Sequence, residues 1–120
     1  MTISQKQLIK NIKAEMNDII LLRDEMRRYI ILSGEEQGEL KNPAKVAELY
    51  DAEYRWHANT IVILLARDKK TPTAELIRRR TDIARQILEI TEELVQSGDI
   101  PEQEYLEDCK YYSEELQNLL

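Results

Sequence analysis

Apolar and aromatic side chains recur at helical spacing through the middle of the chain. Alternating steps of three and four residues, beginning after Pro43, place six side chains on one face of a helix: Ala47, Tyr50, Tyr54, His57, Ile61 and Leu64. Residues 61–66, which form the last turns of this helix, are apolar at every position. A helix that is apolar all round must be covered on every side, by other helices or by a second subunit. The pattern therefore predicts a helix over 43–68 whose end is enclosed.

Three further apolar stripes predict helices over 4–32, 72–97 and 101–120. The first stripe contains Leu8, Ile12, Ile19, Leu22, Met26 and Tyr29, the second Leu76, Ile83, Ile87, Ile90 and Leu94, and the third Tyr105, Cys109, Tyr112, Leu116 and Leu119. Capping and turn residues separate the stripes, at Ser4 with Gln7, Ser33-Gly34, Asn42-Pro43, Thr71-Pro72 and Ser97-Gly98-Asp99. We predict an all-α fold with one domain over 1–120, a four-helix up-down bundle with a long first helix.

The apolar positions outnumber those that four helices can enclose around one core. Helix 4–32 has a stripe of double width, and residues 61–66 have no polar face. Surplus apolar surface of this kind indicates an oligomer interface. We expect a homo-oligomer, in the first place a dimer, with an interface that includes Trp56, Ile61, Val62, Ile63 and Leu65.

Three polar residues interrupt the apolar stripes: Glu15, His57 and Arg80. Antiparallel packing of consecutive helices brings these three residues, together with Thr60, to one level of the bundle. One interpretation is a polar pocket that binds a small ligand or a nucleotide, or that works by acid–base chemistry. A second is an ion pair between Glu15 and Arg80 that fixes the helix register. In a third, Arg80 extends its stem to reach solvent.

Two acidic pairs have a spacing that allows a shared metal ion. The sequence reads Glu35-Glu36-x-x-Glu39 and then Glu48-x-x-Asp51. Carboxylates three or four positions apart lie on one side of a helix and can bind Mg²⁺ together. The pattern resembles the metal-ligand signature of the MazG-like all-α NTP pyrophosphohydrolases, which carry both pairs on packed helices. The resemblance implies an Mg²⁺-dependent enzyme with Glu36, Glu39, Glu48 and Asp51 as ligands.

Charge is unevenly distributed along the chain. The formal net charge is −6, and the last twenty residues set Lys110 against six acidic residues. An acidic helix 101–120 would favour solubility or attract a second, basic protein, and the overall acidic balance opposes nucleic-acid binding. No apolar run approaches the ~20 residues that span a bilayer. The N-terminus lacks a basic-then-apolar signal, so we expect a cytoplasmic protein that does not enter membranes.

Few residues offer catalytic chemistry. His57 and Cys109 are the single histidine and the single cysteine, and the predicted helices separate them. The sequence contains no phosphate-binding loop, dinucleotide fingerprint or zinc-ligand spacing. We therefore expect a non-catalytic protein without a cofactor that acts by protein–protein interaction, as an adaptor, a regulator or a structural oligomer. The alternatives are an Mg²⁺-dependent pyrophosphohydrolase and a sensor that binds a small ligand or a nucleotide.

Overall fold

The structure, a computed structural model, describes residues 4–31 and 41–118. In these residues the chain forms four α-helices: α1 (Gln5–Ile31), α3 (Pro43–Asp68), α4 (Ala74–Ser97) and α5 (Glu102–Asn118). The predicted all-α fold is confirmed. Across the described part of the chain, no helix is both long and apolar enough to cross a membrane. The predicted helix end at Ser33-Gly34 lies outside the described residues.

Capping residues set where α1 and α3 begin. The Ser4 hydroxyl accepts a hydrogen bond from the backbone N–H of Gln7, at 3.1 Å. The Asn42 side chain accepts one from the N–H of Lys45, at 3.3 Å, and Pro43 occupies the first turn of α3. Both caps satisfy N–H groups that have no partner inside the helix, which explains why the helices begin at these positions.

The loop before α4 differs from the prediction, because Thr71 closes α3 and does not cap α4. The N–H of Thr71 donates to the carbonyl of Ala66, and the N–H of Lys70 donates to that of Arg67. Lys70 takes the left-handed conformation, with φ of 58°, that this type of helix ending requires. The N-cap of α4 is consequently Thr73. Helix α4 ends in the same way, with Gly98 as the left-handed residue at φ of 87°.

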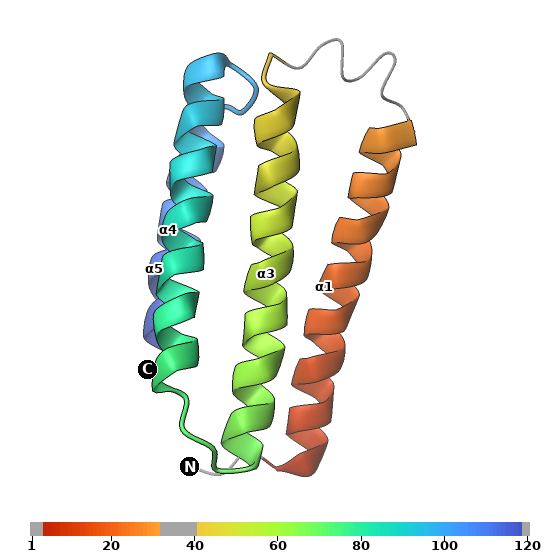
Figure 1. Cartoon of the computed structure of the whole chain (residues 1–120), viewed down its shortest axis with the longest axis vertical. Coiled ribbons are helices and arrows are strands. Elements are labelled where there is room, and N and C mark those ends of the chain that lie inside the picture. The colour runs from red at the N-terminus through yellow and green to blue at the C-terminus, as the bar shows by residue number, and fades with distance from the viewer. Residues whose placement is uncertain (1–3, 32–40, 119–120) are drawn as a thin grey trace.

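Helix α3 lies between its neighbours. Figure 1 shows α1, α3 and α4 side by side, with α5 behind α4, in a molecule that measures 48 × 26 × 21 Å. The core joins α3, α4 and α5 and consists of Leu49, Ala52, Trp56, Ala84, Ile87, Leu94 and Tyr112. Helix α1 packs on the other side of α3, where its buried apolar side chains among residues 5–25 are Leu8 and Leu22.

The carboxylate of Asp99 links the turn between α4 and α5 to the start of α3. Asp99, in the turn between α4 and α5, accepts hydrogen bonds from the backbone N–H groups of Lys41, at 2.7 Å, and Asn42, at 2.8 Å. These bonds hold the start of α3 against that turn. The bond from Lys41 is the main reason why the pKa of Asp99 lies below its usual value.

The structure divides the residues expected at an oligomer interface. Trp56 and Ile63 are covered by the chain's own helices, with exposed fractions of 2% and 0%, so in this conformation they cannot contact a partner. Ile61 is half-buried. Val62 and Leu65 remain exposed, at 47% and 43%. The end of α3 is thus enclosed only in part: Ile63 and Leu64 are buried, whereas Val62 and Leu65 face outward.

Candidate functional site

Two polar clusters lie at the same level of the fold, on different sides of α3. Trp56 and Thr60 are four residues apart and face the core, where Thr60 donates a hydrogen bond to the Trp56 carbonyl. His57 follows Trp56 directly, and a rotation of about 100° per residue turns its side chain towards α1. His57 nevertheless contacts Glu15 on α1, and Thr60 contacts Arg80 on α4, although the two residues are only three positions apart on α3.

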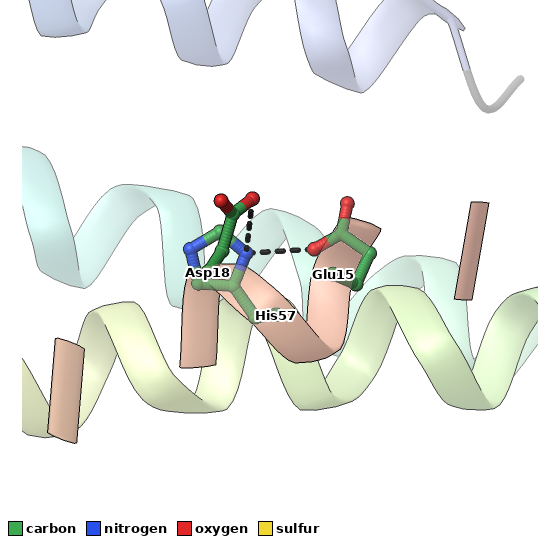
Figure 2. Close-up of side chains that lie close together, drawn as sticks. All are labelled: Glu15, Asp18 and His57. Carbon is green, nitrogen blue, oxygen red and sulfur yellow. Dashed lines mark hydrogen bonds and ion pairs between the residues drawn. The ribbon is translucent and has the colours of Figure 1, made fainter. Parts of the chain in front are cut away.

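The first cluster joins α1 to α3 (Figure 2). His57 Nδ1 lies 2.7 Å from Glu15 Oε2 and 4.0 Å from Asp18 Oδ2. Glu15 and Asp18 are three residues apart on α1, so their carboxylates lie on one side of that helix. Burial lowers the pKa of His57, but the hydrogen bond to Glu15 and the nearby negative charges have the opposite effect and leave it raised. Glu15 and His57 are half-buried, whereas Asp18 is exposed.

Two more carboxylates lie beside this cluster. Glu25 and Glu53 line a small cavity of about 200 Å³ together with Asp18 and His57. The pKa of Glu53 is raised to about 7, mainly by burial and in addition by the charges of Asp108 and Glu25. The carboxyl group of Glu53 has a strongly raised pKa and lies next to the imidazole of His57. Such a combination marks a candidate functional site.

The second cluster surrounds the buried side chain of Arg80 on α4. Its guanidinium lies 3.5 Å above the centre of the Trp56 ring. Nη1 donates to the Thr60 hydroxyl and, at 3.5 Å, to Asn59 Oδ1. Nη2 is 4.0 Å from a carboxylate oxygen of Glu115 on α5. Nε is buried and has no hydrogen-bond partner among the described residues.

The structure brings the predicted polar residues together in pairs. Glu15 contacts His57, and Arg80 contacts Thr60, but the ion pair expected between Glu15 and Arg80 is absent from the described contacts. Arg80 has Glu115 as its acidic neighbour, although the more distant Glu15 also favours its charged form. Burial lowers the pKa of Arg80 by more than the two carboxylates raise it, so the pKa lies below its usual value. Arg80 also does not reach solvent, so the snorkelling interpretation is wrong.

The carboxylates of the pyrophosphohydrolase-like pattern make other contacts where they are described. Glu48 is bound to Lys45 at 3.0 Å, and Asp51 is bound to Arg55 at 3.1 Å, both on the exposed side of α3. Glu36 and Glu39 lie outside the described residues. Within the described ranges, the group of side chains that could hold a metal ion is instead Glu15, Asp18 and His57.

The exposed arginines of α4 do not form an unpaired basic surface. Arg78 and Arg79 lie within 4.0 Å of Glu75, and Arg85 lies 3.6 Å from Asp82. These neighbours neutralise part of the positive charge that the three arginines bring to this side of α4.

Comparisons with protein-family models, with curated proteins and with solved structures found no match to this chain.

The Arg80 cluster predicts a specific energetic coupling. Thr60→Val removes the closest acceptor of the buried guanidinium and should lower the free energy of unfolding by ~1–3 kcal/mol. In an Arg80→Met background the same change should cost under ~0.5 kcal/mol, because no buried donor is left unpaired. Urea unfolding followed by circular dichroism would measure this double-mutant cycle. A matched cycle between Glu15→Gln and Arg80→Met should give a smaller coupling energy than the cycle with Thr60→Val. An equal or larger coupling energy would contradict the assignment of Thr60 as the direct partner of Arg80.

The raised pKa of Glu53 predicts a pH-dependent stability. The charges that face Glu53 are His57 on α3, Glu25 on α1, and Asp108 and Glu104 on α5. Since the folded-state pKa of about 7 exceeds the ordinary value of 4.5, ionisation of Glu53 destabilises the fold as the pH rises through this window. Glu53→Gln should therefore become more stable than the wild type above neutral pH, by on the order of 2 kcal/mol, and match it in acid.

Urea titrations at a series of pH values would test this expectation. The exposed Glu48→Gln variant is the control, and its stability should parallel that of the wild type throughout. A constant difference between Glu53→Gln and the wild type at every pH would show that the Glu53 carboxyl titrates normally.

Proposed function

We propose that this chain is a helical-bundle protein that acts by protein–protein interaction and associates first with a second copy of itself. The observation that carries the proposal is an uncovered apolar stripe on α1. Ile9, Met16 and Ile20 lie on one flank of the helix, and 51%, 51% and 42% of their surfaces are exposed. Apolar side chains gathered on one flank are typical of an interface, unlike the same residues scattered singly.

Charge complementarity supports a second copy as the partner. The first half of α1 carries Lys6, Lys10 and Lys13, which are exposed and form no ion pair among the described residues. Helix α5 carries one lysine against six acidic residues, and its outer face includes Glu107 and Glu114. Opposite charges on the two helices would steer α1 of one copy towards α5 of the other.

Apolar side chains are available on both faces of this contact. On α5, Leu106 and Tyr111 are exposed, at 53% and 46%. Tyr111, which lies nearer to Glu107 and Glu114 around the helix, would pack against the stripe of α1. A two-fold axis makes this contact twice, α1 to α5 and α5 to α1, so the dimer closes without leaving a free edge.

The proposal extends to the topology and the cellular setting. Figure 1 supports an up-down-up-down bundle, since consecutive helices run in opposite directions there. Among the described residues, α1 packs mainly on α3 and α5 mainly on α4, so each has a side that its main neighbour does not cover. We place the dimer in the cytoplasm as an adaptor, a regulator or a structural unit, with no catalytic step of its own.

Charge reversal tests the proposed pairing of helices. Lys10→Glu/Lys13→Glu places acidic residues on α1 opposite the acidic α5, and Glu107→Lys/Glu114→Lys places basic residues on α5 opposite the basic α1. Each variant alone should be monomeric by light scattering at low salt, because like charges meet at both contacts. A mixture of the two variants should form a heterodimer, because both contacts then join opposite charges.

A matched control changes charges away from both helices. Arg78→Glu/Arg79→Glu on α4 should leave the dimer intact. A wild-type chain that is monomeric at low salt would overturn the proposal, as would variants whose association is indifferent to mixing. Self-association that requires Val62 and Leu65 but not the lysines would place the interface at the end of α3 and contradict the α1–α5 pairing.

A further inference from the structure

The cluster of Glu15, Asp18 and His57 has the composition of a metal site as well as of a hydrogen-bonded pair. Each residue offers one ligand atom, and the three atoms lie within 4.8 Å of one another. Figure 2 shows that both carboxylates approach the imidazole ring, and its dashed lines join one ring nitrogen to an oxygen of each. An imidazole nitrogen among the ligands distinguishes this group from Glu48 and Asp51 on α3, which are bound to neighbouring basic residues.

The distances are close to those that a bound ion requires. Ligand atoms about 2.1 Å from one metal ion lie between about 3 and about 4.2 Å from each other, depending on the angle. The separation of 4.0 Å between His57 Nδ1 and Asp18 Oδ2 falls in this range. The contact of 2.7 Å between Nδ1 and Glu15 Oε2 is that of a shared proton, and it would widen by a few tenths of an ångström around a metal ion. The outer limit of 4.8 Å on the separations within the group exceeds this range, so the carboxylates must rotate towards each other to share one ion.

The ligand types select the class of ion. One imidazole nitrogen with two carboxylate oxygens suits divalent first-row transition metals such as Zn²⁺, whereas Mg²⁺ and Ca²⁺ favour sites built from oxygen alone. Three protein ligands leave at least one position for water. The exposure of Asp18 keeps that position accessible from solvent.

The surroundings favour a cation. Glu25 and Glu53 line the cavity next to Asp18 and His57, and no lysine or arginine is among its lining residues. Four carboxyl groups therefore surround one imidazole. The negative charge of these carboxylates is balanced most simply by a positive charge within a few ångströms. A divalent cation supplies two positive charges at one point.

We propose that Glu15, Asp18 and His57 bind a divalent transition-metal ion between α1 and α3. The ion replaces the proton between Nδ1 and the Glu15 carboxylate and bonds to both helices. Because its ligands come from two helices, bound metal holds α1 to α3 and stabilises the folded chain by mass action. This site is independent of the dimer proposed above, since neither Lys10, Lys13 nor the acidic face of α5 is a ligand.

Zinc titration of the metal-stripped chain, without an affinity tag, tests the site directly. Isothermal calorimetry should show one Zn²⁺ per chain and much weaker binding of Mg²⁺. His57 is the only histidine, so its imidazole NMR signals should shift with the same saturation curve. The work is done in a Cys109→Ser background, which removes the single thiol as a competing ligand. Zn²⁺ should also raise the thermal midpoint of unfolding.

Two variants and one control complete the test. His57→Gln and Asp18→Asn should each weaken Zn²⁺ binding by ~10-fold or more. Asp18 is exposed, so its variant folds even if the change at His57 disturbs α1. Glu48→Gln, on the exposed side of α3, should bind like the parent. Absence of saturable Zn²⁺ binding, unshifted His57 signals, or unchanged affinity in Asp18→Asn would show that the cluster is a hydrogen-bonded pair only.

Discussion

The packing of Trp56 between α4 and α5 is the interaction on which the rest of the structure depends. Its ring meets the edge of Tyr112, with centroids 4.8 Å apart, and the guanidinium of Arg80 covers its face. A buried guanidinium is costly unless its donors are paired, and Thr60 and Asn59 supply acceptors at this position. Few arrangements of three helices satisfy all these contacts together, so this cluster fixes the register of α3, α4 and α5.

Helix α1 depends on a different set of contacts, which it makes mainly with α3. Its buried apolar side chains within residues 5–25 are Leu8 and Leu22, and between them the contact with α3 includes the polar pair of Glu15 and His57. A helix packed on one neighbour leaves much of its surface uncovered. Both proposals follow from this position: the uncovered stripe and lysines of α1 offer a surface to a second chain, and the polar contact offers ligands from two helices to one cation.

The sequence predicted the helices well and the directions of individual side chains less well. Apolar spacing is a local property, so it revealed each helix and its approximate ends. Antiparallel packing also gave the right height for Glu15 and Arg80, but height along a bundle does not determine the angle around each helix axis. Asp18 and Glu53 gave no signal, because an acidic residue beside an apolar stripe resembles any solvated one in a chain rich in glutamate. Only the fold showed that both approach His57.

The central claim is that α1 is an edge helix, attached to α3 through a contact that is separate from the core of α3, α4 and α5. Native-state hydrogen exchange, at a concentration where the chain is monomeric, measures this most directly. The account predicts that amides in the middle of α1 exchange through a local opening whose free energy is clearly below that of amides beside Trp56 and Ile87. Equal protection in α1 and in the core, with both exchanging only by global unfolding, would contradict it.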